Sequence, residues 1–466
     1  MTAYDMIIKN AKIPIDREFL EADICINEGK IAKIHKGASP ADSSHSIDAK
    51  GMLVFPGLID PHVHFRDPGL TYKEDFLSGS RGAIAGGVTT VFDMPTTLPV
   101  VTTSVLLEEK LRIVGERAVS NFALIAAASV DNISEIQGLA KAGAIGFKTY
   151  MVSPPKDRVK EYGGSYVTNS GELYRVMREV RKTGLVQCIH AESDSTVTCL
   201  TEEMHSKGRK DPMAHYDSRP NFTEAEAVYD ATLLSQVLDT KIHFVHISTS
   251  EAADLISQAK RKGVNVSAET CPHYLCFSKE ILNEKGPYAK YNPPPRNTSD
   301  LESLFSAINT NTISMISTDH APHSKEEKER GWQDIFRAPP GTPGVETRLP
   351  ILLKMAHDGR LNLADIPKLT SESAARRFGL YPKKGCVAEG SDADLVIIDY
   401  SEIWDVKASE LQTKAWETVI FDGMLVRGRV KCTLLGGKVA FEEGGRFAKP
   451  GTGQFVRGNT ERMNIS

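Results

Sequence analysis

The sequence predicts an α/β fold in which a (β/α)8 TIM barrel carries a small β-sandwich domain built from both chain termini. Three observations lead to this prediction. The chain has 466 residues, which is too long for one small domain. Short strand-like runs alternate with longer amphipathic runs through the middle of the chain, and strand-like runs without helices occur at both ends.

Residues 1–55 are predicted to form the first half of the sandwich. They contain the strand-like runs YDMIIKNAKI, ADICINEGKIAKI and GMLVF. Turn-like segments such as KGASPADSS and DAKG separate these runs. Short strands joined by turns, with no helical period between them, favour an antiparallel β unit.

Residues 56–385 are predicted to form the barrel. Strand-like runs such as TTVFDM, NFALIAA, AIGFKTYM and VQCIH alternate with helical runs such as SVLLEEKLRIVGER and GELYRVMREVRKTG. Both a closed barrel and an open doubly wound sheet have this pattern. No GxGxxG follows the first strand and the number of repeats approaches eight, so the closed barrel is favoured.

Residues 386–466 return to strand-like runs, among them DADLVIID, KAWETVIFDG and RVKCTLLGGKVAFEEG. They are predicted to form the second half of the sandwich and a tail. The barrel would then be inserted between the two halves of the β unit.

The composition favours a soluble folded protein that acts on a small molecule. Hydrophobic residues make up 41% and charged residues 25%, and the net charge is -4, which gives no positive field for nucleic acid or anionic lipid. No apolar run approaches the roughly 20 residues of a membrane span. Seven cysteines without a CxxC pair, and an N-terminus without signal-peptide features, predict reduced thiols and a cytoplasmic location.

Two histidines two residues apart provide the first functional signal. His62 and His64 lie at the end of the strand-like run LIDPHVH, and the strand period of two points both rings to the same side. This is a chelating arrangement for a metal ion. The alternative is a pair of structural histidines in a loop.

Four further residues occur near the ends of predicted barrel strands, where the active sites of such barrels are built. They are Lys148, His190, His246 and Asp319. Lys148 interrupts an apolar strand, so its amine must be paired, neutral or modified. A neutral amine can add carbon dioxide, and the resulting carbamate can bridge two cations. The alternative is a lysine that extends to solvent or forms an ion pair.

Taken together, these motifs resemble those of the amidohydrolase superfamily, and within it the cyclic amidohydrolases. That group includes dihydroorotase, hydantoinase, dihydropyrimidinase and allantoinase. The resemblance is carried by FPGLIDPHVHFRDPG, GGVTTVFDMP, GAIGFKTYM, HAES, SRPNFTEAEA, FVHIS, ETCPHY, STDHAPH, GVETRLP and GSDADLVIID. These motifs are spread over essentially the whole chain.

The resemblance implies a centre of two divalent metal ions. One ion would be held by His62, His64, carboxylated Lys148 and Asp319, and the other by Lys148, His190 and His246. Zinc is the expected metal, although manganese, cobalt and iron suit the same ligands. Asp319 is implied as the catalytic residue that takes a proton from the attacking water and passes it to the leaving nitrogen.

The resemblance also implies substrate contacts, and these favour a dihydroorotase. Arg66, Asn292 and His323 match dihydroorotase positions that touch the substrate. Thr96 is the fourth expected substrate contact, although dihydroorotases have an asparagine at its position. A guanidinium suits a carboxylate, so an anionic cyclic amide is expected. The reaction would be the reversible closure of N-carbamoyl-aspartate to dihydroorotate.

Other features keep two alternatives open. MPTTLPV and EKERGWQDIF are more typical of hydantoinases and allantoinases, yet the tyrosine of many hydantoinases is Ser153 here. The first alternative is therefore a hydantoinase, allantoinase or dihydropyrimidinase. The second is a noncatalytic, dihydropyrimidinase-like scaffold, which the six suitable residues at the ligand positions disfavour. The resemblance implies a homodimer or homotetramer.

Overall fold

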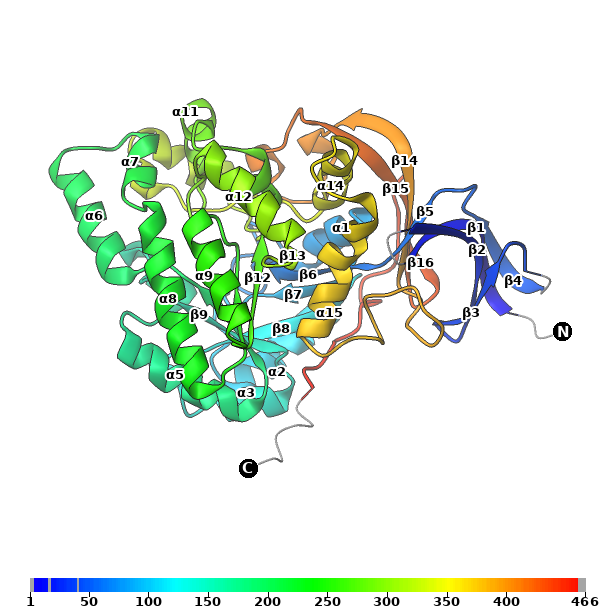
Figure 1. Cartoon of the computed structure of the whole chain (residues 1–466), viewed down its shortest axis with the longest axis horizontal. Coiled ribbons are helices and arrows are strands. Elements are labelled where there is room, and N and C mark those ends of the chain that lie inside the picture. The colour runs from blue at the N-terminus through cyan, green and yellow to red at the C-terminus, as the bar shows by residue number, and fades with distance from the viewer. Residues whose placement is uncertain (1–3, 16–17, 40–41, 460–466) are drawn as a thin grey trace.

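The computed structural model describes residues 4–15, 18–39 and 42–459, and it contains two large sheets (Figure 1). Eight strands from the middle of the chain form a parallel sheet that curls into a barrel. Nine strands from the two ends form a mixed sheet beside it. The predicted fold class is confirmed.

The barrel strands follow one another in chain order, and each pairs in parallel with the next. They are β6 (Leu58–Val63), β7 (Val88–Asp93), β8 (Asn121–Ala127), β9 (Gly146–Tyr150), β10 (Val186–His190), β11 (Ile242–Phe244), β12 (Val266–Thr270) and β13 (Met315–Ile316). A parallel bridge between Val63 and His320 links the first strand to the segment after the last. The carboxyl ends of all eight strands therefore surround one opening.

Helices surround the barrel (Figure 1). The helices of seven or more residues are α1 (Phe76–Ala85), α2 (Ser104–Gly115), α3 (Ile136–Ala142), α5 (Ser170–Thr183), α6 (Asp194–Ser206), α8 (Asn221–Leu238), α9 (Ser250–Arg261), α12 (Thr298–Asn309) and α14 (Arg348–His357). Shorter ones are α4 (Val159–Tyr162), α7 (Pro212–Asp217), α10 (Pro272–Cys276), α11 (Ile281–Lys285), α13 (Lys325–Glu329) and α15 (Ser373–Arg377).

Helix α5 shows why these segments are helical. Leu173, Val176 and Val180 recur at helical spacing and are fully buried, so one face of the helix packs toward the barrel. The side chain of Asn169 accepts a hydrogen bond from the backbone N–H of Glu172, which caps the first turn. Gly184 ends the helix with a φ of 67°, a left-handed conformation that glycine adopts without strain.

The second sheet joins the two ends of the chain. Its strands are β1 (Tyr4–Ile15), β2 (Glu18–Asn27), β3 (Lys30–Lys36), β4 (Ser43–Asp48), β5 (Leu53–Pro56), β14 (Leu395–Asp405), β15 (Leu425–Leu435), β16 (Lys438–Glu442) and β17 (Arg446–Phe447). The halves meet where β5 pairs antiparallel with β14, for example at Val54 and Ile397. The prediction that both termini build one β unit is confirmed.

Buried side chains connect the first and last barrel strands. Arg348, fully buried at the start of α14, donates from Nη1 to the carbonyls of Ile59 (3.2 Å) and Ile316 (3.0 Å). Asp60 Oδ2 accepts a hydrogen bond from Thr318 Oγ1 at 2.7 Å and lies 3.8 Å from the Arg348 guanidinium. These contacts fix the register between β6, which carries His62, and β13, which precedes Asp319.

A buried ion pair supports the loop after β6. Lys110 from α2 donates to Asp93 Oδ2 at the end of β7, and both side chains are at most 1% exposed. The other carboxylate oxygen of Asp93 accepts a hydrogen bond from the backbone N–H of Phe65 at 2.8 Å.

In the described part of the chain, no helix combines the length and the apolar character that a membrane span requires.

The Lys110→Met substitution should lower the free energy of unfolding by about 3–5 kcal/mol, because it leaves the Asp93 carboxylate buried without a counter-charge. Urea denaturation measures this change. The control is Lys182→Met, which removes a half-exposed pair with Glu179 on α5 and should cost no more than about 1 kcal/mol. Equal losses for the two variants would contradict this account of Asp93.

Candidate metal centre

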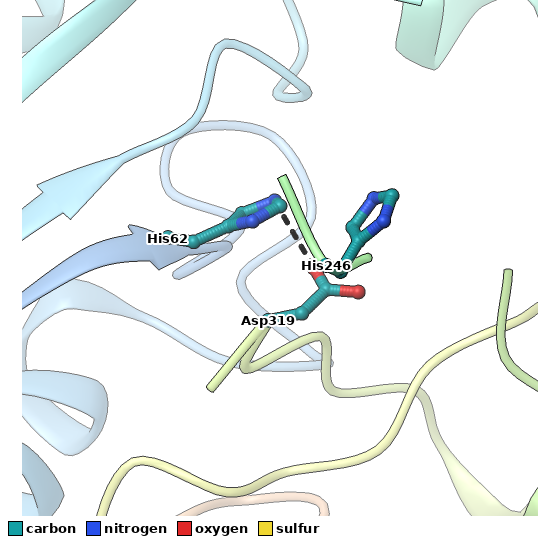
Figure 2. A group of neighbouring side chains, drawn as sticks. All are labelled: His62, His246 and Asp319. Atoms are coloured by element: carbon teal, nitrogen blue, oxygen red, sulfur yellow. Dashed lines mark ion pairs between the residues drawn. The ribbon is translucent and has the colours of Figure 1, made fainter. Parts of the chain in front are cut away.

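All six residues predicted as metal ligands line one cavity at the carboxyl ends of the barrel strands. His62 lies in β6, Lys148 in β9, and His190 at the end of β10, while His246 and Asp319 follow β11 and β13. Figure 2 shows His62, His246 and Asp319 converging from three separate segments. Residues that are far apart in the sequence therefore share one site.

Three of these residues form a compact group that can hold a metal ion. One ligand atom from each of His62, His246 and Asp319 lies within 4.8 Å of the others. Asp319 Oδ1 lies 3.2 Å from the Nε2 atoms of both His62 and His64. Ligand atoms on one tetrahedral zinc lie about 3.3 Å apart, given metal–nitrogen distances of about 2.0–2.1 Å. The spacing of this group fits a shared ion.

The remaining ligand candidates lie directly beside this group. His190 Nδ1 lies 2.9 Å from His246 Nε2, and Lys148 Nζ lies 3.4 Å from His62 Nε2. The Nδ1 atom of His246 is buried and has no hydrogen-bond partner among the described residues. A buried imidazole nitrogen without a partner is costly, which also fits a site completed by a ligand.

Outer hydrogen bonds fix the orientation of the histidine rings. Glu269 Oε1 lies 2.7 Å from His62 Nδ1, and Glu192 Oε2 lies 2.7 Å from His190 Nε2. Thr96 Oγ1 lies 2.6 Å from His64 Nδ1. Each contact engages one ring nitrogen and leaves the other directed into the centre, which is the usual support for a metal-binding histidine.

Glu269 is ionised despite its full burial. Burial alone would raise the pKa of its carboxyl group, but hydrogen bonds from His243 and His62 outweigh burial and hold the pKa below its ordinary value. Its second oxygen lies 3.0 Å from His243 Nε2. A fixed negative charge therefore lies directly behind His62.

Burial perturbs the two charged groups that face each other in the cavity. It lowers the pKa of the Lys148 amine to about 8, although the charge of Asp319 opposes this shift. It also raises the pKa of the Asp319 carboxyl group, and the positive charge of Lys148 opposes that change. A neutral lysine amine is therefore accessible near physiological pH.

The backbone is strained at three cavity residues. Arg66, His246 and Asp319 have φ values of 60°, 39° and 46°, in the left-handed region that disfavours ordinary side chains. Such conformations persist where the surrounding structure holds them, and they are frequent at functional sites. Here the strain directs three polar side chains into the cavity.

The four predicted substrate contacts occupy two different positions. Arg66 and Asn292 line the cavity. Arg66 is 2% exposed, and its Nε and Nη1 atoms have no hydrogen-bond partner among the described residues. His323 lies behind it, with Nε2 at 3.3 Å from Arg66 Nη2, and Thr96 lies behind His64.

Several residues that shape the site are not among those predicted from the sequence. Glu192 and Glu269 orient histidines, and Tyr150, Arg158 and Arg219 line the cavity. The two glutamates lie in the motifs HAES and ETCPHY, whose sequence alone assigns no role to the acidic residue. Glu192 follows His190 by two residues, a spacing that could have indicated a contact.

Comparison with known proteins places this architecture in a defined group. The family model described as "Amidohydrolase family" matches residues 53–440. An L-hydantoinase of Paenarthrobacter aurescens is 35% identical over 97% of this chain and 98% of its own. A dihydroorotase of Methanosarcina acetivorans is 35% identical (98% and 96%), and an allantoinase of Bacillus velezensis is 34% identical (98% and 98%).

A solved structure has the same fold over nearly its whole length. The L-hydantoinase (dihydropyrimidinase) from Arthrobacter aurescens superposes with a TM-score of 0.92 at 34% identity, covering 97% of this chain and 100% of that chain. The similarity therefore includes the barrel and the sheet formed by the two ends.

The Glu269→Gln substitution should weaken metal binding by about 10–100-fold, because it removes the charge behind His62 and keeps the shape of the side chain. Competition with a chelator, followed by metal analysis, measures this change. Glu109→Gln, an exposed change on α2, serves as the control and should bind metal like the unmodified protein. Unchanged affinity in the Glu269 variant would show that this carboxylate does not support the centre.

Proposed function

Since this chain belongs to the amidohydrolase family and is a cyclic amidohydrolase, we propose that its substrate is a ring that carries a carboxylate, as dihydroorotate does. Hydrolysis would open the ring amide of dihydroorotate to give N-carbamoyl-aspartate, and the reaction would be reversible. The proposed activity is therefore that of a dihydroorotase.

The observation that carries this proposal is that Arg66 is buried and lacks a counter-charge bound to its guanidinium among the described residues. Its guanidinium is buried in the cavity wall and leaves two nitrogens without partners among the described residues. A guanidinium pairs well with a carboxylate because its N–H groups match the two oxygens. An uncharged ring would leave this cation buried and unpaired, which disfavours such a substrate.

A hydantoinase is the second candidate. The first relative described above is an L-hydantoinase, and the hydroxyl of Thr96 contacts His64, so it offers no amide to a substrate carboxylate. Allantoin and dihydropyrimidines belong to the same class of uncharged rings. A noncatalytic scaffold has no support here, because all six ligand-type residues are present and converge on one cavity.

For the metal centre, we propose two divalent ions, with zinc as the expected metal. His62, His64, Lys148 and Asp319 would hold one ion, and Lys148, His190 and His246 the other. To bridge both, Lys148 would be carboxylated: its neutral amine adds carbon dioxide, forms an N–C bond and releases a proton. When bound, such ions lower the pKa of a water molecule and polarise a carbonyl group.

Asp319 would move the proton during ring opening. Its Oδ1 atom contacts the two histidines, so its other oxygen is the one proposed to accept a proton from the attacking water. Burial raises the pKa of this carboxyl group, which helps it to hold that proton until the ring nitrogen leaves. Transfer of the proton to the nitrogen completes the hydrolysis, and the reverse transfer accompanies ring closure.

The assembly and the location of the protein are also proposals. We expect a homodimer or a homotetramer in the cytoplasm. The outer face of α8 exposes Phe222, Tyr229, Leu233 and Val237, an apolar row that suits contact with a second copy. The cysteines are free, as in a reducing compartment.

The activity test compares ring opening of dihydroorotate, hydantoin, allantoin and dihydrouracil by metal-loaded protein. Dihydroorotate should be preferred by at least about tenfold in kcat/KM, which corresponds to about 1.4 kcal/mol in the activation free energy. Arg66→Ala should remove that preference, because it deletes the partner of the carboxylate. Arg112→Ala, an exposed change on α2, is the control and should retain the preference.

The same experiment identifies the second candidate. If an uncharged ring is the better substrate and Arg66→Ala has no effect on the order of substrates, the dihydroorotase proposal is wrong and the hydantoinase candidate is favoured. Metal content is measured for each variant, so that loss of the centre is not mistaken for loss of specificity.

The carboxylation proposal predicts a requirement for bicarbonate. Metal-free protein, prepared in mild acid to remove carbon dioxide, should recover two ions per chain and its activity faster with zinc plus bicarbonate than with zinc alone. Isotope-labelled bicarbonate should give a carbamate signal by NMR, and Lys148→Gln should abolish it. Full recovery without bicarbonate and without such a signal would contradict carboxylation.

A further inference from the structure

We propose that Arg158 is a second residue that binds the carboxylate of the substrate, and that it helps to select anionic rings. This inference rests on the proposed function, since it assumes a substrate with a carboxylate. Arg158 belongs to a different loop from Arg66 and to none of the motifs that carry the family resemblance. It would add a specificity-determining contact to the same cavity.

Arg158 points inward from an exposed turn. It ends a short 3-10 helix (Lys156–Arg158) in the connection between β9 and α5. Lys156 and Val159 are exposed, whereas Arg158 is 8% exposed and lines the cavity. A charged side chain leaves solvent in this way only when partners or a ligand compensate it.

Two of the three nitrogens of its guanidinium are held in place. Glu161 Oε2 accepts hydrogen bonds from Nε at 3.2 Å and from Nη2 at 2.5 Å, and the guanidinium lies 5.2 Å from the centre of the Tyr162 ring. The third nitrogen, Nη1, is buried and has no hydrogen-bond partner among the described residues. The orientation is fixed, and one donor remains available to a ligand oxygen.

The charged groups around Arg158 favour the binding of an additional anion. Glu161 lies 3.7 Å from Lys73, and Lys73 lies 2.9 Å from Glu327. Arg66, Lys73 and Arg158 all interact electrostatically with Glu161. The buried amine of Lys328 interacts in the same way with Arg158 and Glu327. His323 adds no positive charge, because burial holds its pKa well below the ordinary value. A carboxylate from a substrate would add a counter-charge beside Arg66 and Arg158.

The placement of the two arginines matches such a ligand. Arg66 follows β6 and Arg158 follows β9, and both line the cavity that holds Lys148 and Asp319. Each has at least one buried guanidinium nitrogen without a partner. A ring whose amide lies at Asp319 would direct its carboxylate between the two loops, where the two arginines would bind it together.

The test is Arg158→Gln in metal-loaded protein, with dihydroorotate and dihydrouracil as substrates. The KM for dihydroorotate should rise by about 10–100-fold, the usual effect of losing a hydrogen bond to a charged group, and kcat should change by less than about threefold. Kinetic constants for dihydrouracil should change little, because that ring has no carboxylate. Arg158→Lys should restore part of the affinity.

Lys160→Gln is the matched control, because it removes an exposed positive charge from the same connection. It should leave both KM values unchanged, whereas a similar rise in KM for dihydroorotate would indicate a general charge effect and overturn the proposal. Circular dichroism and metal analysis establish that each variant is folded and loaded.

The outcomes separate this inference from the proposed function. If the unmodified protein prefers uncharged rings, the proposed function fails, and the inference fails with it. If it prefers dihydroorotate, Arg66→Ala removes that preference, and Arg158→Gln affects charged and uncharged rings equally or not at all, the dihydroorotase proposal stands and the role of Arg158 is wrong.

Discussion

The join between β6 and β13 is the constraint on which the site depends. His62 and His64 come from one side of this join and Asp319 from the other, so their distances follow from how the barrel closes. Backbone contacts at this point are few, since β13 has two residues. The buried guanidinium of Arg348 donates a hydrogen bond to a carbonyl on each of the two strands, and these bonds help to hold β6 and β13 together.

Around this frame, the cavity is organised in layers of charge. Carboxylates behind the histidines fix the rings, as Glu269 does for His62. Within the cavity, burial lowers the pKa of Lys148 and raises the pKa of Asp319, so that it favours the neutral form of each group. In the outer layer, Arg66 and Arg158 line the cavity, and each has a buried guanidinium nitrogen without a partner among the described residues. The inner layers suit the chemistry common to cyclic amidohydrolases, while the outer layer is suited to discriminating among their substrates.

The fold, and the convergence of the six candidate ligand residues on one cavity, could be predicted because both leave local signals. Strand period places His62 and His64 on one side, and a lysine inside an apolar strand, Lys148, is conspicuous. The contact of Thr96 with His64 and the buried position of Arg158 could not be predicted, because each depends on contacts between loops that have no periodicity. Thr96 is predicted as a substrate contact, and the structure adds a contact between its hydroxyl and His64 Nδ1 at 2.6 Å. Glu161, which orients Arg158, likewise acquires its role only in the folded chain.

The pairing of β5 with β14 has a consequence for synthesis of the chain. Val54 and Ile397 are neighbours in the sheet, although more than three hundred residues separate them in the sequence. During translation, the N-terminal strands emerge early and their sheet edge stays unpaired until the ribosome has released β14. Such long-range pairing slows folding and leaves a strand edge available for aggregation. The chain should therefore depend most on chaperones after the barrel strands have emerged and before β14 pairs with β5.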